Sequence, residues 1–240
     1  MKKTYQTLAL SFCLAGSVNL AFADIGGNLS LTSDYRHRGI SQSNETVAIQ
    51  GGIDWFNDQG FYASVWASNV DFFPTGSALD DGAAVEFDVW AGYAGSINDD
   101  LSYDVTLYYF QYPGDDIDQN FVELGLGLNY EDFRLAYNYA NDHLNLGLAN
   151  QYIAVSYTAA LPQEFSLELH AGHSFGELYD DPAVLGLEEY TDYSISLSKT
   201  LADFDLKASY INTDISGAYR VDSGYMANQD SLLVSISRSF

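Results

Sequence analysis

Basic residues and thiols are scarce in this chain of 240 residues. Nine lysines and arginines stand against 33 aspartates and glutamates, a formal net charge of −24, and Cys13 is the single cysteine. A nucleic-acid binder needs basic surface to displace counterions from phosphates, so this balance argues against nucleic acid as a partner. With no other cysteine, the chain after Cys13 can form neither disulfides nor thiolate metal sites.

Residues 1–23 have the pattern of an export signal. Two lysines open the segment, residues 7–22 are mostly apolar or small, and Ala21-Phe22-Ala23 offers a cleavage site. We therefore predict a cleaved signal peptide over 1–23 and a single mature domain over 24–240. Removing the two lysines leaves seven basic against 33 acidic residues, a balance of −26.

Long apolar runs are also missing after the predicted signal. No run of about 18 apolar residues follows it, which excludes a transmembrane helix there. A content of 47% hydrophobic and 15% aromatic residues nevertheless argues against disorder. If the chain spans a membrane, its strands must close into a barrel, because lipid offers no hydrogen bonds to unpaired backbone groups.

What the sequence does contain is alternation, in segments of about ten residues with one apolar and one polar face. We predict an all-β, transmembrane up-and-down antiparallel barrel of twelve strands. Their approximate ranges are 28–38, 46–56, 60–71, 83–95, 101–112, 120–130, 133–142, 150–159, 165–175, 190–200, 204–214 and 230–240. Short turns and longer linkers alternate between them, as periplasmic turns and external loops would, so both termini are expected in the periplasm.

The alternation also predicts which side chains face lipid. In the first segment we expect Leu29, Leu31 and Tyr35 to contact lipid, and this segment should pair with the last strand to close the sheet. Inward glycines, such as Gly125 and Gly172, should leave room for water in the middle of the barrel.

Aromatic residues flank the predicted short turns. These residues are Trp55, Phe61, Tyr93, Tyr103, Tyr130, Phe133, Tyr157, Phe165 and Phe204, with the terminal Phe240 at the same level. Such a belt is typical of a headgroup interface. A second, less regular ring is predicted at Tyr35, Tyr109, Tyr137, Tyr152, Tyr193 and Tyr210. The alternation that ends in Phe240 resembles the signal read by the barrel assembly machinery.

The segment 33–42, SDYRHRGISQ, carries a family resemblance together with segments 48–52, 60–63 and 66–71. These blocks resemble the N-terminal signature of the TorF-type porins of proteobacterial outer membranes. The resemblance covers roughly the first third of the chain. It implies an outer-membrane barrel with a pore and names no solute.

The polar faces predict a charged lumen. The inward positions hold Asp34, Asp54, Glu86, Asp88, Asp104, Glu123, Glu168, Asp192 and Asp205 against Arg36, Arg38, Arg134 and Lys207. One interpretation is a diffusion pore whose acidic walls favour cations, with Arg36 and Arg38 at a constriction. The equally weighted alternative is that these charges pair only to stabilise a solvated interior.

Histidines and loop acids give no prediction of catalysis, metal or cofactor. His170 and His173 should point to opposite faces of one strand, and Ser174 should face away from its neighbour His173, so neither pair suits a metal or a nucleophile with its base. Acidic pairs in the linkers, such as Asp80-Asp81 and Asp115-Asp116, could hold divalent cations that bridge to lipopolysaccharide. Solvated loop charge is the simpler interpretation.

The favoured function is passive diffusion of small hydrophilic solutes, with a preference for cations, through an outer-membrane channel that is not an enzyme. Two alternatives stay open: a structural or adhesive barrel without an open pore, acting through its loops, and a soluble secreted β-sandwich that binds a ligand. Expected partners of the channel are outer-membrane lipid, lipopolysaccharide, the barrel assembly machinery and the solutes. Self-association into a homo-oligomer is left open.

Overall fold

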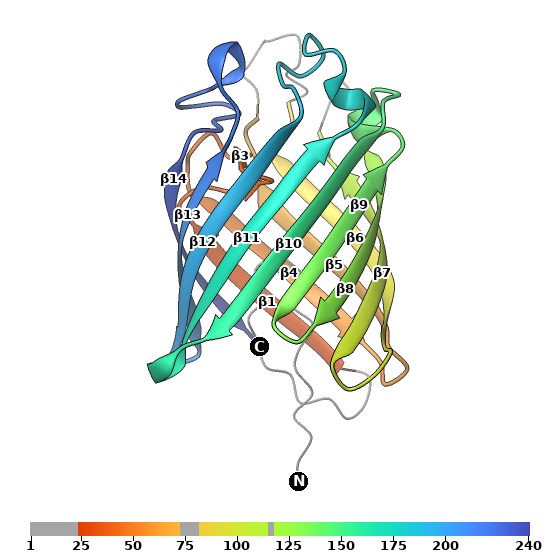
Figure 1. The fold of residues 1–240 in the computed structure, drawn as a ribbon, viewed down its shortest axis with the longest axis vertical. Helices are drawn as coiled ribbons and strands as arrows, with labels where there is room; N and C mark the ends of the chain where they lie inside the picture. Colours follow the sequence, from red (N-terminus) through yellow and green to blue (C-terminus); the bar gives the residue numbers. More distant parts are fainter. Residues whose placement is uncertain (1–23, 73–81, 115–117) are drawn as a thin grey trace.

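The computed structural model describes residues 24–72, 82–114 and 118–240. Twelve antiparallel strands form a closed barrel (Figure 1). They are β1 (Asp24–Thr32), β4 (Ala48–Phe56), β5 (Phe61–Asn69), β6 (Val85–Ser96), β7 (Leu101–Gln111), β8 (Phe121–Tyr130), β9 (Phe133–Ala140), β10 (Asn150–Ala160), β11 (Phe165–Phe175), β12 (Tyr190–Leu201), β13 (Phe204–Thr213) and β14 (Ser231–Ser239). The predicted fold class and strand number are confirmed, and the closed barrel rules out the β-sandwich alternative.

Each barrel strand pairs with its neighbours along the chain, and the first pairs with the last. β1 pairs with β14, with Leu31 opposite Ile236, as the sequence predicted for closure. Closure leaves no sheet edge with unpaired backbone groups. Short connections gather at one end of the barrel and long ones at the other (Figure 1). We call these the short-turn end and the long-loop end.

The alternating pattern sorts side chains as predicted. On β8, Val122, Leu124, Leu126 and Leu128 are exposed on the outside, and Glu123 is buried on the inside. Leu29 and Leu31 are likewise exposed. On β5, where the sequence left the orientation open, Tyr62, Ser64, Trp66 and Ser68 face inward and are buried. The outer surface is thus a band of aliphatic side chains around a polar and aromatic interior.

Aromatic side chains surround the barrel near its short-turn end. Trp55, Phe61, Tyr130, Phe133, Phe204 and Phe240 are all at least 36% exposed. Several touch across strands, such as Phe133 and Tyr157, whose ring centroids lie 4.7 Å apart. The second predicted ring is partly wrong. Tyr35 and Tyr152, 5% and 7% exposed, lie inside the barrel, whereas Tyr109, Tyr193 and Tyr210 are exposed outside.

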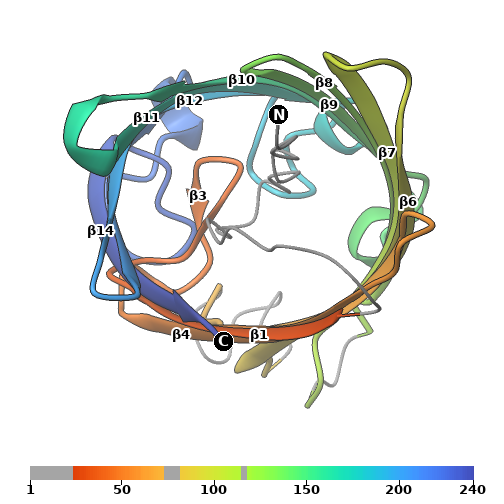
Figure 2. The ribbon, with the colours of Figure 1, turned by 90° about the horizontal axis from the view of Figure 1, so that it is seen from below.

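The main departure from the predicted strands falls in the first segment. The strand expected over 28–38 begins at Asp24 and ends at Thr32, and the chain then leaves the barrel wall. Two short strands, β2 (Arg36–His37) and β3 (Ile40–Ser41), pair only with each other inside the barrel (Figure 2). The expected lipid contact of Tyr35 is therefore wrong.

The described residues also form four 3₁₀ turns: η1 (His143–Asn145), η2 (Pro162–Glu164), η3 (Glu177–Tyr179) and η4 (Gly217–Tyr219). Over the described residues, no helix is long and apolar enough to cross a membrane. The predicted signal peptide and the acidic pairs Asp80-Asp81 and Asp115-Asp116 lie outside the described residues.

The three tryptophans test which side chains face outward. Trp55 is 36% exposed on the outside, whereas Trp66 and Trp90, at 8% and 7%, lie inside. In variants that keep one tryptophan each, a brominated detergent should quench Trp55 strongly and the other two weakly, because quenching requires contact with the bromine. Fluorescence of the refolded variants measures this. Equal quenching at Trp55 and Trp90 would contradict the assigned faces.

Candidate functional site in the barrel lumen

Residues 33–47 fold back into the barrel, and we call this segment the lumen hairpin (Figure 2). Its tip is a two-residue turn at Arg38 and Gly39, with φ values of 50° and 83°. Positive φ at both central positions is the tight-turn geometry that suits the twist of a hairpin. A side chain at Gly39 would also collide with Thr213 and Asp192. The tip therefore fits closely against the wall formed by β12 and β13.

The carboxylate of Asp34 organises the base of the hairpin. One of its oxygens accepts hydrogen bonds from Ser41 Oγ at 2.6 Å and Ser43 Oγ at 3.0 Å. The other accepts from Arg36 Nε at 2.8 Å. The Arg36 side chain is fully buried and also donates to the carbonyl oxygens of Gly39 and Gln229. Asp34 and Arg36 thus lie within the hairpin rather than on the barrel wall, where the predicted strand placed them.

Arg38 joins the tip of the hairpin to the barrel wall. Its Nη2 donates to both carboxylate oxygens of Glu123 on β8, each at 2.8 Å. Its guanidinium also lies 4.4 Å from the centroid of the Tyr152 ring on β10. The side chains of Arg38 and Glu123 are only 8% and 3% exposed. Arg38 and Glu123 thus neutralise each other's charge, and both side chains are largely desolvated.

Tyr35 fixes the opposite side of the hairpin. Its hydroxyl donates to Glu86 Oε1 at 3.2 Å, and its ring meets Trp66 edge-on with centroids 5.5 Å apart. Glu86 and its neighbour Asp88, two residues along β6, are both 2% exposed. These two predicted lumen carboxylates therefore lie against the hairpin.

Apolar side chains cover the hairpin on the side of the long loops. Ile40 packs with buried residues of these loops, such as Leu178 and Leu187, and with Tyr190 at the start of β12. Nearby, burial and the Arg38 guanidinium lower the pKa of His143 to about 3, so that its imidazole is neutral. A small cavity of about 80 Å³ lies in this region, with His37 and Arg38 in its lining.

A larger cavity of about 300 Å³ lies on the other side of the hairpin, and we call it the chamber. His37 and Arg38 line both cavities, so the hairpin separates them. The chamber extends toward the short-turn end, where Asp54 and Arg134 are part of its lining. Since a water molecule takes up about 30 Å³ in the liquid, this volume is enough for several water molecules.

Ten of the thirteen predicted pore residues line the chamber. They are Asp34, Asp54, Asp104, Glu123, Glu168, Asp192, Arg36, Arg38, Arg134 and Lys207. Glu86 and Asp88 are buried beside the hairpin, and Asp205 lies on the inward face of β13, where it accepts a hydrogen bond from Thr200. Six carboxylates against four basic groups give the chamber lining an acidic balance.

Most of the chamber carboxylates have a basic partner. Arg134 Nη1 lies 2.7 Å from Asp104 Oδ1, and Lys207 Nζ lies 3.4 Å from Glu168 Oε1. Asp54 is different: it accepts only neutral hydrogen bonds in the described part of the chain, from Ser64 at 2.7 Å and Asn28 at 3.3 Å. Asp54 is therefore a source of unbalanced negative charge in the lumen.

Two inward glycines, Gly127 and Gly172, do not leave the empty space that was predicted, whereas Gly125 lines the chamber. A Cβ at Gly127 would collide with the Asp104 and Arg134 side chains, and one at Gly172 would collide with the Tyr152 hydroxyl. These glycines allow large neighbouring side chains to lie flat against the wall. The space they provide is used for ion pairs and aromatic rings, and this is a close-packing role.

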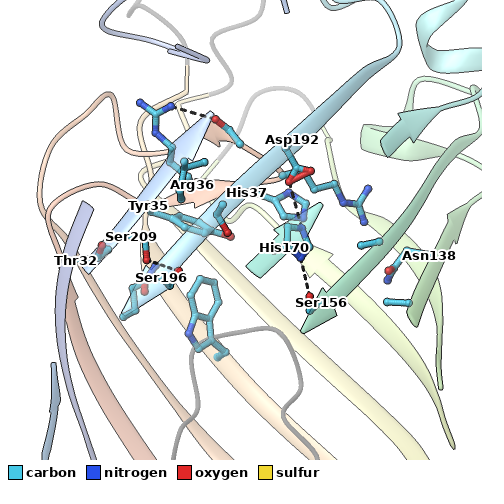
Figure 3. Close-up of a pocket in the computed structure, with 18 of the residues that line it drawn as sticks. Thr32, Tyr35, Arg36, His37, Asn138, Ser156, His170, Asp192, Ser196 and Ser209 are labelled. Carbon is cyan, nitrogen blue, oxygen red and sulfur yellow. Dashed lines mark hydrogen bonds and ion pairs between the residues drawn. The ribbon is translucent and has the colours of Figure 1, made fainter. Parts of the chain in front are cut away.

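A polar network that the sequence did not predict connects three neighbouring strands (Figure 3). His170 Nδ1 lies 2.8 Å from Ser156 Oγ, and His170 Nε2 lies 2.9 Å from the Tyr152 hydroxyl and 3.5 Å from Asp192 Oδ1. His173 points to the outer face, toward Thr191, as expected from its spacing to His170. Only the strand register brings Ser156 opposite His170, so sequence alone could not identify this contact.

The serine, histidine and aspartate of this network resemble an acyl-transfer relay, but the surroundings favour a structural role. Catalysis would also need donors for a developing oxyanion. Ser156 lies in the middle of its strand, opposite Arg134 on β9 and His170 on β11. The backbone N–H groups there are used in hydrogen bonds between the strands and are not available to an oxyanion. Among the described residues, no group of three histidine or acidic side chains is arranged to hold a metal ion.

Comparison with solved structures places the barrel in a known class. The chain is similar to the KdgM porin, with a TM-score of 0.54 and 12% identity over 90% of this chain and 98% of that one. It is similar to the NanC porin, with a TM-score of 0.55 and 12% identity over 90% and 99%. A KdgM complex with disordered oligogalacturonate gives a TM-score of 0.53, also at 12% identity and over 90% and 98%. The fold is thus that of a twelve-stranded, porin-like barrel.

The chain belongs to the family described as a bacterial protein of unknown function (Gcw_chp), whose model matches residues 21–240. No curated protein matches it by sequence. The porin-like class agrees with the resemblance noted from the sequence, although the family model does not carry the TorF name.

The ion pair at the hairpin tip can be tested by a double-mutant cycle. We expect Arg38→Ala and Glu123→Ala each to lower the free energy of unfolding by about 3 kcal/mol, because each leaves a buried charge unpaired. The double variant should lose much less than the sum. Urea unfolding of the refolded barrel in micelles measures this coupling.

The control for this cycle is the exposed pair Arg220 and Asp222, whose side chains are 30% and 84% exposed. Its coupling should be near zero, because solvent screens exposed ion pairs. Equal coupling energies for the two pairs would contradict the assigned role of Arg38.

Proposed function

We propose that this protein is an outer-membrane channel for the passive diffusion of small hydrophilic solutes. The observation that carries the proposal is a charged chamber of about 300 Å³ inside a closed barrel whose outer surface is aliphatic. Such an outer surface suits hydrocarbon, and only a closed barrel satisfies all strand hydrogen bonds there. The porin-like fold of KdgM and NanC supports the same conclusion.

The channel prefers cations. The chamber has more carboxylates than basic groups, and Asp54 has no basic partner among the described residues. Charges that line a narrow pore select against ions of the same sign. The lumen hairpin forms the constriction, and Arg38 is the basic group at its tip. KdgM has been observed with oligogalacturonate, a polyanion, and the acidic chamber here suits such a solute poorly.

The cellular setting follows from the same reasoning. The chain is exported by the signal peptide over 1–23, inserted by the barrel assembly machinery through the strand that ends in Phe240, and surrounded by outer-membrane lipid and lipopolysaccharide. The aromatic belt at the short-turn end would then lie at the periplasmic interface. We assign the chain to the TorF-type porins on the blocks within residues 33–71.

A second candidate function rests on the hairpin itself. The hairpin divides the interior, and apolar side chains of the long loops pack over Ile40. A barrel sealed in this way would act as a structural or adhesive protein through its outer loops. Conductance separates the two candidates, because a sealed barrel passes no ions at any protein load.

Recordings in planar bilayers test the channel and its constriction. The refolded protein should give discrete conductance steps with cation over anion selectivity. The double variant Arg36→Ala and Arg38→Ala should conduct more and prefer cations more strongly, because two guanidinium groups leave the constriction and Glu123 loses its partner. Reversal potentials in a salt gradient measure the selectivity.

The control for these recordings is Arg220→Ala, which removes one charge from an exposed loop. This variant should leave both the conductance and the cation selectivity unchanged. A wild-type barrel that never conducts would reject the channel, and unchanged selectivity in the double variant would reject the constriction.

A further inference from the structure

The two sides of the chamber differ in chemistry. Three aromatic side chains, Trp66, Trp90 and Tyr108, lie inward on the consecutive strands β5, β6 and β7 and line the chamber. We call them the aromatic wall. Trp90 and Tyr108 are direct cross-strand partners, with ring centroids 6.0 Å apart. Together they place aromatic surface along one side of an otherwise polar chamber.

The other side of the chamber is rich in hydroxyls. Ser194 and Ser196 on β12 and Ser209 on β13 line it, and we call them the hydroxyl wall. Ser196 Oγ and Ser209 Oγ lie 2.8 Å apart (Figure 3). In the ring of strands, β4, β1 and β14 separate the two walls on one side and β8 to β11 on the other. The two walls therefore face each other across the lumen.

Aromatic contacts continue from the chamber toward the long loops. Tyr108 stacks near Phe110 with centroids 6.0 Å apart, and Phe110 stacks on Phe121 at 4.6 Å. Phe110 lines the chamber, whereas Phe121 lines the small cavity beyond the hairpin. The ring of His37 lies 6.5 Å from that of Phe110. An unbroken row of rings thus passes beside the hairpin and connects the two cavities.

We propose that the chamber binds uncharged saccharides between the aromatic and hydroxyl walls. A pyranose ring has an apolar C–H face, which suits an aromatic ring, and a rim of hydroxyls, each able to donate one hydrogen bond and accept two. The chamber offers both surfaces, and Asp54 and Asp104 add acceptors. A volume of about 300 Å³ is at the lower end of ordinary ligand pockets.

The acidic balance of the chamber decides between classes of sugar. A sugar acid would bring a carboxylate close to Asp54, which has no basic partner among the described residues, and would be repelled. A neutral sugar has no charge for the carboxylate to repel, and its hydroxyls can donate hydrogen bonds to the carboxylate oxygens. Transport of the sugar rests on the proposed channel function. Binding of the sugar in the chamber does not, and it can be measured without conductance.

The test uses the natural position of the tryptophans. In Trp55→Phe, emission comes only from Trp66 and Trp90, both inside the barrel. Titration of this refolded variant in micelles with maltose should change the emission in a saturable way. Trp90→Phe in the same background should weaken the association constant severalfold, and Trp90→Ala should weaken it by about tenfold. Polyethylene glycol of similar size should give no saturable change.

Two further arms complete the experiment. Galacturonate should bind more weakly than glucose, and equal or tighter binding would overturn the preference for neutral sugars. A linear, non-saturating response to maltose, or equal affinity in wild type and Trp90→Phe, would overturn the sugar site. A heat-dependent shift in gel mobility shows whether each variant has folded. If Trp90→Ala does not fold, Trp90→Phe alone provides the comparison of affinities.

Conductance then separates this inference from the channel itself. If the protein conducts ions, and if added maltose reduces this current in a saturable way, the channel function and the sugar site are both supported. Conductance without any maltose response would leave the channel and remove the sugar site. Saturable fluorescence with a sealed bilayer would confirm the site and reject the channel.

Discussion

The Asp34 carboxylate is the group on which the interior of this barrel depends. It accepts three hydrogen bonds, from Arg36, Ser41 and Ser43, and all three donors belong to the hairpin. A carboxylate that is 4% exposed would be costly without such partners. By gathering them, Asp34 turns the chain away from the wall directly after β1. The position of Arg38, the division of the lumen and the shape of the chamber all follow from this turn.

The barrel could be predicted from the sequence because its cause is local. Each strand alternates between lipid and lumen, and this period of two is visible in any ten residues. The strand predicted over 133–142 ends at Ala140, and most others agree within a few residues. The aromatic belt at the short-turn end was also visible, since it depends only on where the turns fall.

The hairpin could not be predicted, because alternation has the same appearance in both structures. On a strand of the barrel wall, Asp34, Arg36 and Arg38 would point into the lumen. On a hairpin folded into the barrel, the same three residues also lie in the lumen. What distinguishes the two is a set of distant partners, such as Glu123 and Gln229, that only the closed barrel brings near. The Ser156 and His170 contact was missed for the same reason, since it depends on register.

The hairpin also links the stability of the lumen to its charge. Arg38 neutralises Glu123, and Tyr35 donates to Glu86, so the hairpin covers carboxylates of β6 and β8. Water could replace these partners only if all of them separated together, because a single broken contact leaves a desolvated charge. A wider path through the lumen would therefore have more exposed carboxylates along it. The same few hydrogen bonds therefore fix both the open width of the lumen and the number of carboxylates exposed along it.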